Sequence, residues 1–329
     1  MGIYDKTFFS ALSLTAALLV GGTSGCAEAE PGATREGSRL VLNDFDLSDA
    51  AIPVDEIHRG GPPRDGIPSI DNPRFWDVRE ADEFLEDDDT VLGYGEGESA
   101  RAYPFRILVW HEVVNDVVNG EPIAPTYCPL CGTAMVFHRE YGGKVLEFGV
   151  SGLLHNSDVL LYDRETESLW SQIGLDAISG PMKGERLRWL PSEQMSWAAW
   201  RERYPEGKVL STATGFRRDY SRMPYADYEA SPGTMFPYRD HRDDLDTKEW
   251  VAGAIVAGAP KAYPLDAMPD GEVIRDTVGG ETVSVRFETD DDLFTIEKED
   301  GTPVPVVRAY WFAWQAFYPE TQLWKPEGS

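Results

Sequence analysis

An internal repeat constrains the fold of this chain more than any other feature of its sequence. Three short motifs return in the same order 160 residues later. Val-Leu-Gly at 91–93 returns as Val-Ala-Gly, Ala-Tyr-Pro at 102–104 returns unchanged, and Glu-Val-Val at 112–114 returns as Glu-Val-Ile. A further motif, Trp-Ala-Ala-Trp at 197–200, returns as Trp-Phe-Ala-Trp at 311–314. Duplication is the economical explanation of such self-similarity. We therefore expect two related, β-dominated halves, of which the second is shorter.

The middle of the first copy, which the second copy lacks, has the pattern of β-strands. Its apolar and β-branched runs lie at 133–139, 144–150, 157–163 and 167–172, with turn signals at 142–143 and 164–166. The chain shows no alternation of strands with long helices. The sequence therefore predicts a β-rich α+β fold with a few short helices.

Two of these helices are predicted from the spacing of apolar residues. The first lies within 78–86, and the second places Trp197, Trp200 and Tyr204 on one face behind Ser192 as its N-cap. Because large aromatic residues at helical spacing usually face a core, we expect these three side chains in the interior and not at a cofactor.

The N-terminus has the layout of an export signal. Lys6 precedes a mostly apolar stretch at 8–20 that is too short to span a membrane, and small residues follow it up to Cys26. Residues 23–26 resemble a lipoprotein cleavage box, which makes 1–26 a signal peptide and Cys26 the lipid-bearing membrane anchor of an envelope protein. Cleavage after Ala29 would instead release a secreted form.

The remaining chain is expected to form three segments. Residues 27–60 mix Gly, Pro and acidic residues without periodicity, which is typical of a flexible tether. Residues 61–250 then form the domain with the Cys-Pro-Leu-Cys motif, and residues 251–329 form the degenerate second copy.

The charge balance limits the partners of the chain. With 57 acidic and 30 basic residues the net charge is -27, which opposes binding to nucleic acid. Only eight basic residues are Lys. Acid excess with scarce Lys is typical of a salt-adapted organism, and we interpret the acidic runs as solvated surface rather than as a metal site.

Cys128 and Cys131 are the cysteines left once Cys26 is assigned to the anchor. Two thiols at this spacing can form a disulfide, exchange with a partner or bind one soft metal ion. A disulfide across so short a loop adds only about 2 kcal/mol by chain entropy, so a purely structural role is not favoured. A zinc knuckle would need a second Cys or His pair at knuckle spacing, which the chain lacks.

Histidines are the candidates for activating the thiols or completing a metal shell. In the repeat, Glu112 and Asp116 return as Glu272 and Asp276, whereas His111 is replaced by Gly271. We therefore predict a functional role for His111 and a scaffold role for the residues that both copies share. His138 and His155 are further candidate ligands for copper or mercury. Tyr127, Asp158 and Arg218 are candidates for lining a pocket.

The chain resembles the domain-of-unknown-function 3179 family between about Asn72 and Arg242. The resemblance is carried by Trp-His-Glu-Val-Val-Asn-Asp at 110–116, by 127–133 around the two cysteines, and by Val-Ser-Gly-Leu at 150–153 with the Ser-Asp and Tyr-Asp-Arg that follow it. It implies an exported, often lipid-anchored protein. Some members are selenoproteins with selenocysteine at this motif, which implies redox chemistry but no particular substrate.

Three functions remain open on these grounds. The leading hypothesis is a thiol-disulfide or peroxide-type oxidoreductase, in which one of Cys128 and Cys131 attacks, the other resolves the intermediate and a partner protein exchanges electrons with the pair. The second is a protein that binds copper or mercury through both thiolates and one of the histidines. The third is a binding module without chemistry whose thiols rest as a disulfide.

Overall fold

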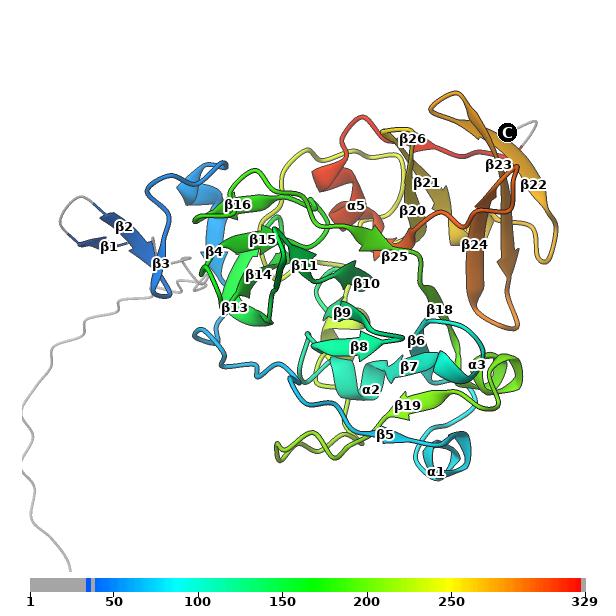
Figure 1. Ribbon diagram of the computed structural model, residues 1–329. Coiled ribbons are helices and arrows are strands. Elements are labelled where there is room, and N and C mark those ends of the chain that lie inside the picture. The colour runs from blue at the N-terminus through cyan, green and yellow to red at the C-terminus, as the bar shows by residue number, and fades with distance from the viewer. Residues whose placement is uncertain (1–33, 37–38, 327–329) are drawn as a thin grey trace, which may run out of the picture. The chain divides into compact units, whose positions relative to one another are not determined.

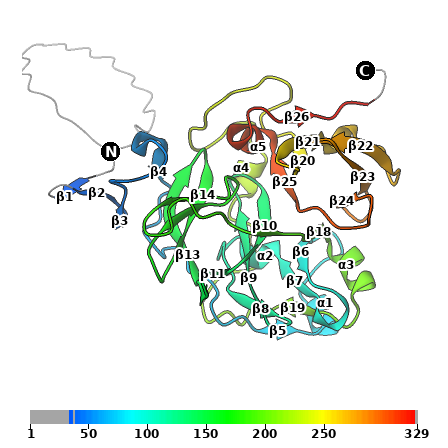
Figure 2. The same cartoon turned by 45° about the horizontal axis from the view of Figure 1, so that its top comes forward.

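Two sheets with the same strand order form the framework of the chain (Figures 1 and 2). The computed structural model describes residues 34–36 and 39–326. The first sheet has the order β18-β6-β7-β19, and β5 extends it; the second has the order β25-β20-β21-β26. The bounds in the first are Glu193–Ser196, Thr90–Tyr94, Arg101–Pro104, Lys208–Leu210 and Phe75–Trp76, and in the second Val306–Tyr310, Trp250–Val256, Ala259–Pro264 and Gln322–Leu323. Among these four strands, β7 and β19 are parallel in the first sheet, and β21 and β26 are parallel in the second. The other neighbouring strands are antiparallel.

The repeated motifs occupy the same places in the two sheets. Tyr103 pairs with Leu92 in the first sheet, as Tyr263 pairs with Ala252 in the second. The Tyr103 hydroxyl donates to Asp116 at 2.7 Å, and the Tyr263 hydroxyl donates to Asp276 at 2.8 Å. The repeated Tyr and Asp residues thus form equivalent contacts, buried in the first sheet and part-buried in the second.

In each sheet the chain forms a smaller meander after β7 or β21, before it returns to the sheet. In the first copy it comprises β8 (Asp116–Val118), β9 (Glu121–Cys128) and β10 (Thr133–His138), with β17 (Trp189–Leu190) beside β10. In the second it comprises β22 (Ile274–Val278), β23 (Glu281–Glu288) and β24 (Leu293–Lys298). Cys128 pairs with Thr133 as Glu288 pairs with Leu293, so the offset of 160 residues extends to the thiol motif.

The aromatic helices are α3 (Trp197–Arg203) and α5 (Trp311–Phe317). Trp197 and Trp200 are fully buried and stack with their ring centroids 5.7 Å apart, so the prediction of a core role is confirmed for these two. Tyr204, at the C-cap of α3, is half-buried and packs on Trp200. The N-cap of α3 is Ser196, whose hydroxyl accepts from the Ala199 N–H at 3.2 Å. The prediction of Ser192 as the cap is wrong, because β18 occupies the residues between Ser192 and the helix.

The remaining helices are short, as expected. They are α1 (Val78–Asp82), which begins with a capping box at Asp77, α2 (Phe105–Leu108) and α4 (Ala226–Glu229), with single 3-10 turns at Val54–Glu56, Gly97–Ser99 and Leu265–Ala267. None of the helices in the described part of the chain has the length and apolarity needed to cross a bilayer.

The middle of the first copy forms a five-stranded antiparallel sheet of order β16-β15-β14-β13-β4. Its strands are Ala177–Ser179, Leu169–Ser171, Asp158–Asp163, Phe148–His155 and Ile57–Arg59. The predicted hairpin turn at Gly142 and Gly143 joins β11 (Glu140–Tyr141) to β12 (Lys144–Val145). Both glycines have positive φ, as a two-residue hairpin turn requires. The prediction of a β-rich fold is confirmed.

The predicted tether at 27–60 is too long, because part of it belongs to the folded unit. β1 (Thr34–Glu36), β2 (Arg39–Leu42) and β3 (Phe45–Asp46) pair in sequence, and β4 joins the edge of β13. Leu42, Phe45 and Ile57 are buried in the same apolar cluster as residues of β13 and β14. The predicted signal peptide, Cys26 and residues 27–33 lie outside the described residues.

Candidate functional site

The Cys-Pro-Leu-Cys motif forms a tight turn between β9 and β10. Both thiols are free, and the side chains of Cys128 and Cys131 are 1 % and 0 % exposed. Gly132 closes the turn with φ of 68°, a conformation that glycine adopts without strain. A Cβ on Gly132 would lie 2.4 Å from the indole of Trp250. The turn is therefore covered directly by the first side chain of β20, in the second sheet.

A second turn, between β13 and β14, faces the thiols. Asn156 and Ser157 form this turn with φ of 51° and 65°. The Ser157 carbonyl oxygen lies 3.9 Å from the Cys128 sulfur and 3.4 Å from the Cys131 sulfur. Asp158 is the next residue in the chain. One of its carboxylate oxygens and the two sulfurs all lie within 4.8 Å of one another. The hairpin thus places a carboxyl group beside the dithiol.

Asp158 is held in an environment that disfavours its charge. It is fully buried, and Oδ2 accepts from the Ile173 N–H at 3.0 Å. Oδ1 has no hydrogen-bond partner among the described residues. Burial raises the pKa of Asp158 from 3.8 to about 7, although a hydrogen bond from the Cys128 thiol acts in the opposite direction. Asp158 can therefore accept or release a proton near neutral pH.

The two thiols are not equivalent. Burial raises the pKa of both, and the nearby carboxyl of Asp158 adds to the increase. The contact between the two thiols acts to lower the pKa of Cys128 and to raise that of Cys131. Cys128 is therefore the thiol that loses its proton more readily.

Glu112 is the site residue that the sequence analysis missed. Its side chain is 6 % exposed and its φ is 58°, which is unusual for a residue other than glycine. Burial, and then the charge of Asp158, raise the pKa of Glu112 to about 8, and Glu112 in turn raises the pKa of Cys128. We assigned Glu112 to the scaffold because it recurs as Glu272, but Glu272 is exposed.

The predicted histidines do not join the thiols. The ring of His111 bridges the Pro68 carbonyl at 2.7 Å and the Tyr220 hydroxyl at 2.8 Å, and burial lowers its pKa to about 4. His138 lies 3.7 Å from Glu121, and His155 lies 3.4 Å from Glu56. The group of potential metal ligands found among the described residues is Cys128, Cys131 and Asp158, without a histidine.

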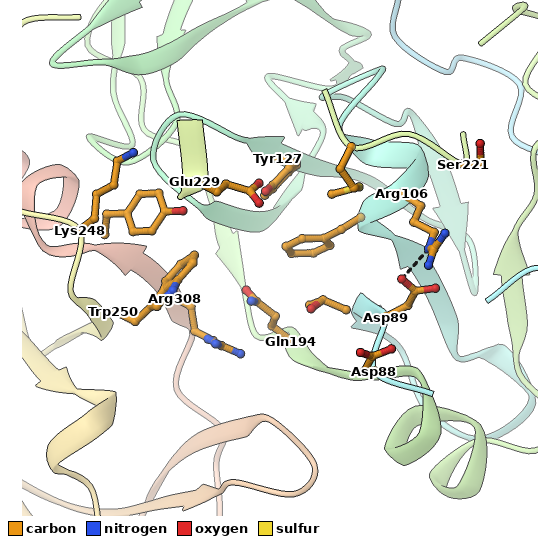
Figure 3. A pocket seen from close by; sticks show the side chains of 14 residues that line it. Asp88, Asp89, Arg106, Tyr127, Gln194, Ser221, Glu229, Lys248, Trp250 and Arg308 are labelled. Atoms are coloured by element: carbon orange, nitrogen blue, oxygen red, sulfur yellow. Dashed lines mark hydrogen bonds and ion pairs between the residues drawn. The ribbon is translucent and has the colours of Figure 1, made fainter. Parts of the chain in front are cut away.

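The arginines nearest to the thiol motif in the sequence bind other groups, and the three pocket candidates lie in different places. Arg139 donates to three backbone carbonyls, and Arg106 pairs with Asp89, so neither stabilises a thiolate. Asp158 joins the thiols as described. Tyr127 lines a cavity of about 510 Å³ (Figure 3), and Arg218 is exposed, near Tyr220 and His111.

The match to a known family covers most of this architecture. The family described as "Protein of unknown function (DUF3179)" matches residues 64–300. The chain belongs to the DUF3179 family. The matched residues extend beyond the resemblance seen at 72–242 and include the thiol turn, the Asp158 hairpin and much of the second copy. No curated protein and no solved structure matches the chain.

This DUF3179 site can carry two kinds of chemistry. Two adjacent thiols beside a proton-accepting carboxyl can cycle between dithiol and disulfide. Two thiolates and a carboxylate can also hold a metal ion. The burial of both sulfurs limits either chemistry to a reactant small enough to reach them.

Proposed function

We propose that Cys128 and Cys131 form a redox-active dithiol that reduces a small hydroperoxide, with Asp158 as the proton acceptor of Cys128. The observation that carries this proposal is the placement of the Asp158 carboxyl within 4.8 Å of two free sulfurs. A thiol must lose its proton to attack, and no cation lies beside Cys128 among the groups that shift its pKa. Asp158 supplies the base that the sequence analysis sought among histidines.

The first step oxidises Cys128. Its proton passes to the Asp158 carboxylate, and the thiolate attacks the terminal oxygen of the hydroperoxide. The O–O bond breaks, an S–O bond forms, and the leaving alkoxide takes the proton from Asp158 to become an alcohol. Cys128 is then a sulfenic acid and Asp158 is again a carboxylate.

The second step involves Cys131. Its sulfur attacks the Cys128 sulfur, the S–OH bond breaks, and water leaves with the Cys131 proton, so that a disulfide forms. Two molecules of a small thiol then restore the dithiol. They are oxidised to one disulfide, and their two protons and two electrons pass to Cys128 and Cys131. A protein partner would need the site to open first, since both sulfurs are buried.

The test is stopped-flow oxidation of the full chain by a hydroperoxide under anaerobic conditions. We expect Cys131→Ser to accumulate a sulfenic acid on Cys128, detected by its adduct with a cyclic diketone, whereas the native chain forms the disulfide. Cys26→Ser in the unprocessed chain is the matched control, because it removes the remaining cysteine and leaves the Cys128–Cys131 site intact. The proposal is contradicted if the hydroperoxide oxidises Cys128 no faster than it oxidises free cysteine.

A soft-metal site is the second candidate, and the unpartnered Oδ1 of Asp158 favours it. Both thiolates and this oxygen could hold a monovalent copper ion. Its positive charge would offset the negative charge of the ligands, which is otherwise costly to bury. In that case metal should remain bound when the chain is purified anaerobically, and Cys128→Ser should release it. Oxidation to a disulfide in a metal-free chain favours the first candidate.

We also propose an origin and a location for the protein. The shared strand orders, the constant offset and the matching Tyr-Asp contacts support a gene duplication in which the second copy has no thiols. The N-terminal sequence supports export with a lipid on Cys26. Mass spectrometry of the protein from its native envelope tests this: a diacylglycerol on Cys26 is expected, and a chain beginning after Ala29 contradicts it.

A further inference from the structure

A cavity separate from the dithiol lies between the two copies (Figure 3). Its volume of about 510 Å³ is within the usual range for small-molecule sites. β18 of the first copy contributes Gln194, and β25 of the second contributes Arg308. Gln194 and Arg308 precede their Trp helices by the same number of residues, so the cavity is built from corresponding positions of the repeat.

Arg308 presents an unused edge of its guanidinium group. Nη1 donates to Asp292, whereas Nε has no hydrogen-bond partner among the described residues and is shielded from solvent. Oε1 of Gln194 is likewise buried without a partner. Buried polar atoms without partners are rare and indicate a missing water or ligand. The Nε edge of an arginine is suited to bind a carboxylate through two parallel hydrogen bonds.

Charged side chains of both signs line the cavity. Figure 3 shows Lys248, Trp250 and Arg308 on one side and Asp88, Asp89 and Arg106 on the other. Arg106 pairs with Asp89 at 2.5 Å, whereas Asp88 has no ion pair among the described residues. Aromatic side chains of Trp250, Tyr310 and Phe105 also line the cavity, and so does the carboxyl group of Glu229. A simple anion is opposed by the net charge of -27, but a ligand with charges of both signs is not.

We propose that this cavity binds a short zwitterionic peptide with an apolar side chain. Its terminal carboxylate lies against the Nε edge of Arg308 after a small rotation of the guanidinium group. Its ammonium group faces Asp88, and its side chain packs on Trp250. The cavity is distinct from the dithiol, because none of the three potential metal ligands lines it, but the two are neighbours that share Trp250 and Tyr310.

Calorimetric titration of the full chain with Gly-Phe, N-acetyl-Gly-Phe and Gly-Phe-amide tests the proposal. We expect each blocked peptide to bind about tenfold more weakly than Gly-Phe, because each lacks one charge. Arg308→Lys keeps the positive charge but removes the Nε edge, so it should weaken Gly-Phe about tenfold and leave Gly-Phe-amide unchanged. The matched control is Arg286→Lys, an exposed substitution in the same copy.

Three outcomes overturn the proposal. One is the absence of saturable binding of Gly-Phe up to about 10 mM, a concentration at which even weak sites fill. The second is equal binding of all three peptides, and the third is equal binding of Gly-Phe to the native chain and to Arg308→Lys. The comparison of the three peptides on the native chain decides the matter even if the Arg308 variant fails to fold.

Discussion

The backbone N–H of Tyr310 donates to the carbonyl oxygen of Cys131 at 2.9 Å, and so ties the thiol turn to the second copy. The corresponding N–H of the first copy, on Ser196, donates to Asp291 at the same distance. Each copy therefore holds the turn of the other, and the copy without thiols supports the copy that has them.

Gly132→Ala should destabilise the protein by about 2 kcal/mol more than Gly142→Ala. Both glycines have positive φ, which costs an alanine about 1–2 kcal/mol. Only the Cβ at 132 would also overlap Trp250, whereas nothing lies within 4 Å of the Cβ at 142. Urea unfolding of the two variants gives the difference. Equal losses would show that Trp250 does not pack on the thiol turn.

The strands, the core helix and the thiol pair were predictable from the sequence, because periodicity and spacing are local properties. Gly142-Gly143 and the Trp197 face follow from such patterns. The partner of the thiols was not predictable in the same way: Asp158 reaches Cys128 only through the pairing of distant strands. His111 and Glu112 show the same limit, because the sequence does not tell which of two neighbours in a turn faces the site.

Asp158→Asn should slow the oxidation of Cys128 at neutral pH by about 10²-fold, the usual contribution of a general base. In the native chain the rate should rise with pH through about 7, as Asp158 becomes ionised and able to accept the proton. The variant should lose this inflection. Stopped-flow measurements from pH 5 to pH 9, with exposed Asp290→Asn as the control, test it. An unchanged profile would remove Asp158 from the mechanism.

Glu112→Gln should make stability less dependent on pH. Glu112 has a pKa of about 8 in the folded protein against 4.5 for the free group, so the folded state binds the extra proton between these values. Stability should therefore fall as pH rises from about 4.5 to 8, by a few kcal/mol. The variant should flatten this decline, and Glu272→Gln, at the exposed equivalent position, should not. Urea unfolding across this range measures both.

His111→Ala should lower stability by about 2–4 kcal/mol, because it leaves the Pro68 carbonyl and the Tyr220 hydroxyl without their partner. The titration of the thiols should not change, since His111 does not lie beside them. Exposed His241→Ala is the control. A shift in the Cys128 pKa in the His111 variant would restore the activating role that the sequence analysis assigned to it.

The intact mass of the metal-free, anaerobic chain before and after one equivalent of hydroperoxide tests the central claim most directly. The account predicts a loss of about 2 Da in the native chain, confined by peptide mapping to Cys128 and Cys131, and a gain of about 16 Da in Cys131→Ser. An unchanged mass of both metal-free proteins after the hydroperoxide is added would contradict it. A soft metal ion bound to the two cysteines in the protein as isolated would then favour the metal site.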